Sequence, residues 1–307
     1  MTVERTAQGR DTMNMTLATF WPIAMEALQA LRRHYYPEME RVATELSLPE
    51  WYGWLLPALA FEPEPISAAK LRLRSPYTSP RLYQERLTNA AKQGFMILLD
   101  EAEGAYRLSE SGKRAAECVL EAAYKKMAML QPLPSAELER LAGLLRRLVM
   151  SCLEAPEPPG KWCITHSRKT DPGNQASGLV RVDQFLSDLA AYRDDAHLAA
   201  WQPYCIEGHA WEAFTYLWRG EATTLDEICR KLARRGYLRE EYLSALEDLI
   251  GCGWVEERDG YQITTLGNEI RQTAEELTDQ YFFSPWSCLT QAELETLRVL
   301  IRLCERP

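Results

Sequence analysis

Apolar residues recur at helical spacing over most of the chain. In residues 133–149 and 289–305, for example, leucines stand three or four positions apart with charged residues between them, which places them on one face of a helix. Two shorter segments differ: KQGFMILLDEAEGAYRLSESG at 92–112 and GCGWVEERDGYQITTLG at 251–267. In both, the pattern predicts a helix that ends at a glycine, a two-stranded hairpin with a polar turn, and a further helix.

The two hairpin segments follow one pattern, and the repeat extends beyond them. The matched pairs are Gly94 and Gly253, Phe95 and Trp254, Tyr106 and Tyr261, Leu108 and Ile263, and Gly112 and Gly267. In the same register the helices before the hairpins repeat, and the leucine-rich segments 133–149 and 289–305 match after them. The copied unit is therefore about half of the chain.

Each copy predicts three helices, a two-stranded hairpin and two further helices. This is the order of a winged helix-turn-helix with helical additions at its C-terminal end. The pattern of Gly-aromatic, hairpin and Tyr-x-Leu-Ser/Thr-x-x-Gly resembles MarR-type winged-helix transcription regulators over residues 50–150 and 209–305. The closing leucine-rich helices look like that family's dimerisation helix. The resemblance implies a mostly α protein with small β-wings, a tandem winged helix-turn-helix whose partner is double-stranded DNA.

We expect three regions in the chain. Residues 14–153 form a first MarR-like unit, residues 154–178 a linker rich in proline and glycine, and residues 179–305 a second, degenerate unit. Because family members dimerise through their terminal helices, two copies in one chain imply an intramolecular pseudo-dimer. A tandem pair of modules that never pair with each other is the alternative.

The two predicted recognition helices and their supports differ in charge. Residues 69–92 hold six basic residues and one acidic residue, whereas residues 224–248 hold five basic and six acidic ones. Because positive side chains supply affinity for the phosphate backbone, only the first copy is expected to bind DNA. The net charge of −9 does not exclude this, since a local basic face suffices.

Candidate DNA-binding residues lie on the third helix of the first copy and on the helix before it. The solvent face of the third helix enters the major groove in this fold, so Arg81, Gln84 and Thr88 are expected to read bases. The remaining candidates, for phosphate contacts and the helix start, are Lys70, Arg72, Arg74, Thr78, Ser79, Arg86 and Lys92. With one basic helix per chain, a palindromic site requires a homodimer. Acidic residues in both hairpins argue against insertion of either wing into the minor groove.

Aromatic residues gather before each helix-turn-helix. By resemblance, an effector pocket would lie where the terminal helices meet the winged domain, and an aromatic lining would suit a small apolar or aromatic ligand. The candidate lining residues are Trp51, Tyr52, Trp54 and Trp211. An aromatic core at helical spacing is the alternative interpretation.

No motif indicates catalysis. The eight cysteines lie far apart without metal-ligand spacing, and GxSxG, GxGxxG, P-loop and HExxH patterns are absent. Asp194, Asp195 and His197, near Asp188, lack a second His or Cys to complete a metal site, so we interpret them as surface or inter-lobe polar contacts. We expect no enzymatic activity, no cofactor and no metal.

The sequence therefore favours a sequence-specific DNA-binding transcriptional regulator that responds to a small ligand. We expect it to be cytoplasmic and without a membrane partner, since no signal-peptide core or apolar run of ~20 residues is present. The alternative is a protein-interaction scaffold built on winged helices that no longer bind DNA. A third hypothesis is an enzyme acting on nucleic acid through tandem winged helices, as some DNA repair glycosylases do, but the sequence designates no catalytic residue for it.

Overall fold

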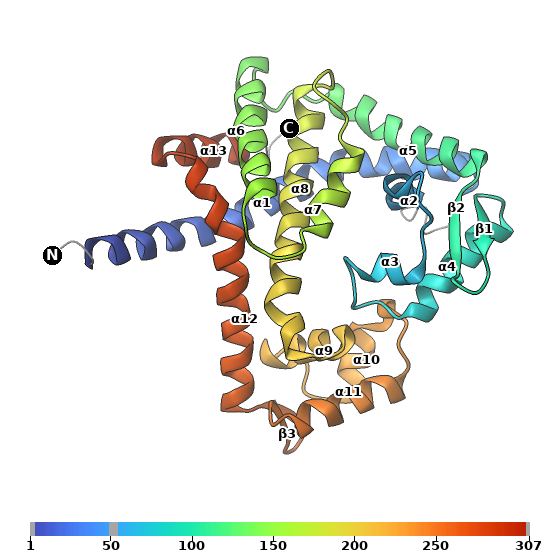
Figure 1. Cartoon of the computed structure of the whole chain (residues 1–307). Helices are drawn as coiled ribbons and strands as arrows, with labels where there is room; N and C mark the ends of the chain where they lie inside the picture. The colour runs from blue at the N-terminus through green and yellow to red at the C-terminus, as the bar shows by residue number, and fades with distance from the viewer. Residues whose placement is uncertain (1–3, 49–54, 305–307) are drawn as a thin grey trace. The chain divides into compact units, whose positions relative to one another are not determined.

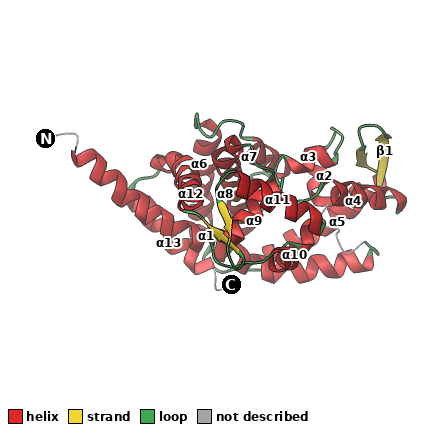
Figure 2. Ribbon diagram, turned by 90° about the horizontal axis from the view of Figure 1, so that it is seen from below, coloured by secondary structure: helices red, strands yellow, loops and turns green. Residues whose placement is uncertain are grey.

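The computed structural model describes residues 4–48 and 55–304; for residues 4–16 and 18 it describes the backbone alone. Within this part helices dominate, and the strands form two short antiparallel hairpins (Figure 2). The expectation of a mostly α fold with two small β-sheets is therefore confirmed. Among the described helices, none has both the length and the apolar character that a bilayer crossing requires.

The first copy contains the expected order of three short helices, a hairpin and two longer helices, after a long N-terminal helix. Its elements are α1 (Glu4–Glu45), α2 (Leu55–Phe61), α3 (Ala68–Arg72), α4 (Pro80–Lys92), β1 (Met96–Asp100), β2 (Ala105–Leu108), α5 (Glu110–Ala128) and α6 (Ser135–Glu154). The connecting segment, residues 154–178, holds α7 (Trp162–Ser167) and the 3-10 turn η2 (Arg168–Thr170).

The second copy repeats this order. Its elements are α8 (Gly178–Trp201), η3 (Gln202–Tyr204), α9 (Gly208–Trp218), α10 (Leu225–Lys231), η4 (Ala233–Arg235), α11 (Arg239–Gly251), β3 (Val255–Glu257), β4 (Tyr261–Ile263), α12 (Thr265–Phe283), η5 (Ser284–Cys288) and α13 (Gln291–Cys304). The order of elements from α2 to β2 thus matches the order from α9 to β4.

The chain divides into two compact units, and each collects segments from both copies. The helical unit comprises Met1–Ala60, Lys113–Ala196 and Asp279–Pro307. The winged unit comprises Phe61–Gly112, which we call head 1, and His197–Thr278, which we call head 2. Both hairpins, α3, α4, α9, α10 and α11 therefore belong to the winged unit, as does most of α12. The helical unit holds α1, α6 and α13 and most of α5 and α8.

The repeated Ser/Thr-x-x-Gly motif joins each wing to the helix that follows it. In head 1 the hydroxyl of Ser109 donates to the backbone oxygen of Gly94 at 2.6 Å and accepts from the backbone nitrogen of Gly112 at 3.0 Å. In head 2 Thr264 makes the same two bonds, at 2.7 and 3.0 Å, to Gly253 and Gly267. One hydroxyl thus caps a helix N-terminus and ties it to the turn before the hairpin, which explains why the pattern occurs twice.

The helical unit is held together by the matched leucine-rich helices. α13 packs against α1 and α6 (Figure 1). The contact is apolar at its centre, since Leu141, Leu145 and Leu148 of α6 and Leu297 and Ile301 of α13 are all fully buried. Burial of such side chains is the main stabilising term in a helix pair. The two helices that correspond by sequence therefore belong to one core.

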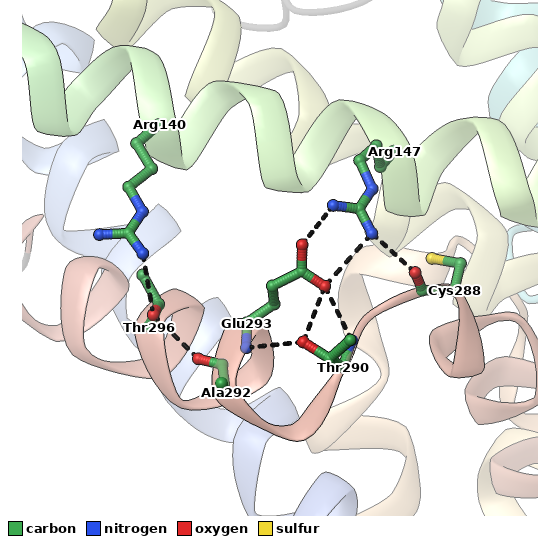
Figure 3. A network of polar contacts seen from close by, with 7 residues as sticks. All are labelled: Arg140, Arg147, Cys288, Thr290, Ala292, Glu293 and Thr296. Atoms are coloured by element: carbon green, nitrogen blue, oxygen red, sulfur yellow. Dashed lines mark hydrogen bonds and ion pairs between the residues drawn. The ribbon is translucent and has the colours of Figure 1, made fainter.

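Polar contacts fix the register of α6 against α13 and the turn before it (Figure 3). Arg147 donates to both carboxylate oxygens of Glu293, at 2.5 and 3.3 Å, and to the backbone oxygen of Cys288 at 2.8 Å. Glu293 also accepts from the backbone and hydroxyl of Thr290. The hydrogen bonds from Arg147 and then from Thr290 lower the pKa of Glu293 to about 2. Because solvent-accessible ion pairs contribute little to stability, the Arg147–Glu293 pair mainly fixes the register of the two helices.

The core of each head is built from its third helix and its aromatic residues. In head 1, Tyr83, Leu87 and Ala90 form the buried face of α4, and Met96 and Tyr106 pack beneath it from the hairpin. In head 2, α9 packs against α11, and the rings of Trp211, Phe214 and Trp254 lie 5.4 to 6.4 Å apart. Both third helices therefore turn one face inward and leave the opposite face to the surroundings.

Candidate nucleic-acid interface

α4 is the candidate recognition helix, and its start is set by local sequence. Ser79 caps it, because its hydroxyl accepts from the backbone nitrogen of Leu82 at 3.1 Å, and Pro80 occupies the first helical position. The helix ends where Gly94 adopts a positive φ of 82°. Its exposed stripe consists of Arg81, Glu85, Asn89 and Lys92. Asn89 was not among the residues predicted from the sequence, although its spacing of eight residues from Arg81 places it on that stripe.

Two of the predicted base-reading residues bind the protein's own wing. Gln84 donates from Nε2 to the hydroxyl of Tyr106 at 3.0 Å, and Oγ1 of Thr88 lies 3.0 Å from the same hydroxyl. Both side chains are half-buried. The structure therefore places Gln84 and Thr88 at the junction of α4 and β2, where they orient the hairpin against the helix.

The first turn of α4 is covered by head 2. The backbone nitrogen of Ser79 donates to the backbone oxygen of Arg235 at 2.8 Å, and Nη2 of Arg81 donates to the backbone oxygen of Gly236 at 2.6 Å. Thr78 and Ser79 are only 5% and 2% exposed. The two residues predicted for the helix start are thus buried. Arg81, which was predicted to read bases, keeps an exposed side chain, but its guanidinium already has an acceptor.

The predicted phosphate contacts have different surroundings. Lys70 donates to the backbone oxygen of Pro65 at 2.7 Å, and Arg72 pairs with Glu207 at 3.3 Å. Burial lowers the pKa of Arg86, which is half-buried. Arg74 and Lys92 are exposed, as is Arg107 on the hairpin. Arg74, Arg107 and Lys92 are thus the exposed basic residues of head 1 that accompany Arg81.

The equivalent face of α11 in head 2 is acidic and apolar. Its exposed residues are Arg239, Glu240, Glu241, Leu243, Ser244, Glu247, Asp248, Ile250 and Gly251. Arg239, the basic member of this set, pairs with Asp226. The acidic residues of α11 are exposed and not buried. The charge difference between the two third helices in the sequence is therefore also a difference between the exposed surfaces of α4 and α11.

The hairpin of head 1 combines apolar and acidic residues. Ile97, Leu98 and Leu99 are 42%, 45% and 49% exposed, which is unusual for three successive large apolar residues. In the turn, the carboxylate of Asp100 accepts from the backbone nitrogens of Ala102 and Glu103 at 2.9 and 3.1 Å. This wing offers little positive charge to a phosphate backbone.

Of the residues predicted to line an effector pocket, Trp51, Tyr52 and Trp54 lie outside the described residues. Trp211 is buried, and its ring stacks on those of Trp201 and Tyr204 at 5.4 and 5.9 Å. Arg271, which was not predicted from the sequence, is a buried arginine whose Cζ lies 4.9 Å from the ring centroids of both Trp211 and Trp218. Burial lowers the pKa of Arg271, against the opposing effect of Glu275.

The acidic run on α8 has a structural role in the connection between the copies. Asp195 accepts from the backbone nitrogens of Cys163 and Ile164 at 2.7 and 2.9 Å, so it caps α7. Asp188 accepts from Ser167 and Arg168, both at 2.7 Å. These two carboxylates are 4% and 0% exposed, so the surface alternative of the earlier interpretation is wrong for them. They bond the connecting segment to α8.

Comparisons with known proteins give one finding. Residues 170–306 match a helix-turn-helix family, and this range contains α9, α10, α11 and the β3–β4 hairpin. No curated protein and no solved structure matches the chain. The match supports a DNA-binding helix-turn-helix unit within residues 170–306 and, more generally, a DNA-binding function.

Proposed function

We propose that the protein is a sequence-specific DNA-binding transcriptional regulator made of two MarR-like winged-helix copies in one chain. The observation that carries the proposal is the helix-turn-helix family match over residues 170–306. The element order of the matched segment is repeated by α2 to β2 in the other copy. DNA recognition is assigned to head 1, because its third helix exposes Arg81, Asn89 and Lys92 where α11 exposes carboxylates.

The pseudo-dimer arrangement is part of the same proposal. In regulators with one winged-helix domain per chain, terminal helices of two subunits pair; here α6 and α13 occupy corresponding places after the two wings and pack on each other. Their buried leucines and the bonds from Arg147 support pairing within the chain. Recognition of a palindrome would still require two chains, since each chain has one basic recognition helix.

Selection from a random-sequence duplex pool tests the DNA-binding function. An enriched motif whose binding weakens linearly in log–log salt titration would support a DNA reader, and the slope would count its phosphate contacts. A pool with no enriched motif and no salt dependence would contradict the proposal.

Charge reversal at Lys92 tests the assignment to α4. Lys92→Glu should weaken binding to every sequence and reduce the salt slope by about one or more, because it removes a positive charge beside the phosphates. Lys125→Glu is the matched control: Lys125 is 72% exposed, lies on α5 and belongs to the helical unit. Equal losses in the two variants would mean that net charge, and not α4, governs binding.

Asn89→Ala separates base reading from phosphate binding. The amide of asparagine can bond adenine in two places, and its loss should change the selected motif while leaving the salt slope unchanged. An unchanged motif would show that Asn89 does not contact a base.

The proposal also includes a small apolar or aromatic effector that acts near Trp211. The rings of Trp201, Tyr204 and Trp254 and the guanidinium of Arg271 surround this residue. A screen of aromatic compounds by thermal shift, repeated on Trp211→Phe, tests it: compounds that stabilise both proteins equally do not act through this residue.

A protein-interaction scaffold is the second candidate, and the exposed apolar strand Ile97–Leu99 with its acidic turn favours it. A partner bound through this wing should dissociate from Leu98→Lys and remain bound to Lys92→Glu. The opposite pattern would favour the DNA reader.

A further inference from the structure

Heads 1 and 2 touch through a small set of residues within the winged unit. From head 1 come Arg72 at the end of α3, the loop 75–79 that precedes α4, and the first turn of α4 itself. From head 2 come the end of α8, the start of α9 and the η4–α11 connection. We call this set of contacts the latch.

Tyr77 is the central side chain of the latch on the head 1 side. Its hydroxyl accepts from Nε1 of Trp201 at 3.1 Å, and the two ring centroids lie 6.0 Å apart. The guanidinium of Arg235 lies over the tyrosine ring, with Cζ 5.6 Å from the centroid. Arg235 is itself held by both carboxylate oxygens of Glu212, at 2.8 and 2.5 Å. Tyr77 therefore contacts a side chain, Arg235, whose position is fixed by bonds within head 2.

Backbone and charged groups add to this contact. Ser79 and Arg81 donate to the backbone oxygens of Arg235 and Gly236, and Arg72 pairs with Glu207. The oxygens of Arg235 and Gly236 lie at the end of η4, where Gly236 adopts a positive φ of 76°. Such directional bonds to backbone oxygens fix one position of α4 against head 2.

Two glycines allow the heads to approach this closely. A Cβ at Gly208 would lie 2.6 Å from the backbone oxygen and 2.7 Å from the carbonyl carbon of Pro76. A Cβ at Gly236 would lie 2.7 Å from Cβ of Leu82 and 2.9 Å from Oγ of Ser79. All of these neighbours belong to head 1. A side chain at either position would therefore push the two heads apart.

The latch covers the part of α4 that a recognition helix uses first. Residues near the N-terminus of such a helix contact base edges in the major groove. Here Ser79 is 2% exposed and the guanidinium of Arg81 bonds head 2. The second half of α4, with Asn89 and Lys92, stays exposed.

We propose that the contact between the heads is an autoinhibitory latch: while it is closed, the first turn of α4 is sealed against head 2, and base reading by head 1 requires the heads to separate. This inference rests on the proposed function, because it concerns the regulation of the same DNA-binding helix. Only molecules with an open latch bind DNA, so the apparent affinity falls in proportion to the open fraction. A latch that is closed in about 90% of the molecules therefore weakens DNA binding about tenfold.

Two variants open the latch from opposite sides. Gly208→Ala places a methyl group against the backbone of Pro76 from head 2, and Tyr77→Ala removes the central ring from head 1. Gly251→Ala is the matched control, because a Cβ at Gly251 of α11 meets nothing within 4 Å. Each protein is compared with the parent in two measurements: amide hydrogen exchange of residues 75–83, which reports the latch without DNA, and affinity for the selected duplex.

Faster exchange together with affinity raised about tenfold in Gly208→Ala and Tyr77→Ala, but not in Gly251→Ala, is the expected result. Faster exchange with unchanged or weaker DNA binding would overturn the autoinhibition. Unchanged exchange in both opening variants would overturn the latch itself. A third outcome is faster exchange in the two opening variants while neither the parent nor any variant binds a duplex. In that case the proposed DNA-binding function has failed, although the latch itself exists.

Discussion

Gly267 makes a closer contact than any larger residue could, so its replacement by alanine should destabilise the protein. It lies in the first turn of α12, and a Cβ there would stand 2.1 Å from the backbone oxygen of Trp254. The same oxygen accepts a 3.0 Å hydrogen bond from the backbone nitrogen of Thr264, at the end of the wing. A backbone oxygen cannot rotate away, so the helix or the strand must move.

The size of the effect follows from three terms. Forcing a methyl group into a filled space costs about 1–3 kcal/mol. Weakening the hydrogen bond from Thr264 adds about 0.5–1.5 kcal/mol. The better helix propensity of alanine returns up to about 1 kcal/mol. Gly267→Ala should therefore lower the free energy of unfolding by about 2 kcal/mol, and Gly112→Ala should do the same, since its Cβ would lie 1.9 Å from the backbone oxygen of Phe95.

Urea unfolding followed by tryptophan fluorescence measures the change. Gly143→Ala is the control, because Gly143 is exposed on α6 and a Cβ there meets nothing within 4 Å. That variant should gain up to about 1 kcal/mol from helix propensity alone. If Gly267→Ala and Gly143→Ala shift the free energy of unfolding in the same direction by the same amount, the close approach of Gly267 to Trp254 has no energetic cost.

Three further predictions concern stability. Leu297→Ala in the buried face of α13 should cost about 2–5 kcal/mol in urea unfolding, whereas Val299→Ala, at a 47% exposed position of the same helix, should change it by no more than about 0.5 kcal/mol. Thr224→Ala removes the cap of α10 and should cost about 1 kcal/mol; a neutral result would show that the cap is dispensable. Burial, against the opposing charge of Arg32, raises the pKa of Asp183 from its usual 3.8 to about 6. The native state then binds this proton more tightly than the unfolded state, so its contribution to stability should fall as the pH rises from about 4 to 6, and Asp183→Asn should remove that part of the pH dependence. Parallel pH profiles for parent and variant would contradict this.

The helices and hairpins could be predicted because their signals are local. Ser109 and Thr264 bond groups within fifteen residues of themselves, and Gly112 and Gly267 allow contacts with carbonyls seventeen and thirteen residues before them. A repeat of such a motif in the sequence is therefore a repeat of the same hydrogen bonds. The buried leucine stripes of α6 and α13 were equally readable, since helical spacing alone fixes which residues share a face.

The candidate site could be predicted only in part. The positive charge of α4 and the acidic surface of α11 follow from composition, and the exposed positions of Lys92 and Glu247 agree with it. The roles of the other residues depend on contacts between distant segments. Gln84 and Thr88 bond Tyr106 because the hairpin folds back on α4, and Ser79 is buried by Arg235, which is 156 positions later in the chain. No spacing rule within a helix reveals such a partner.

The pattern shared by the two hairpin segments, the elements of each half of the chain and the position of the basic helix follow from the sequence alone. Those properties depend on neighbours along the chain, where caps, glycines and helical spacing act. The tertiary structure shows in addition that Asp188 and Asp195 bond the connecting segment and that head 2 covers the first turn of α4. Burial and the acceptors that satisfy each buried donor are set by residues far away in the chain, so they exist only once the segments have packed together.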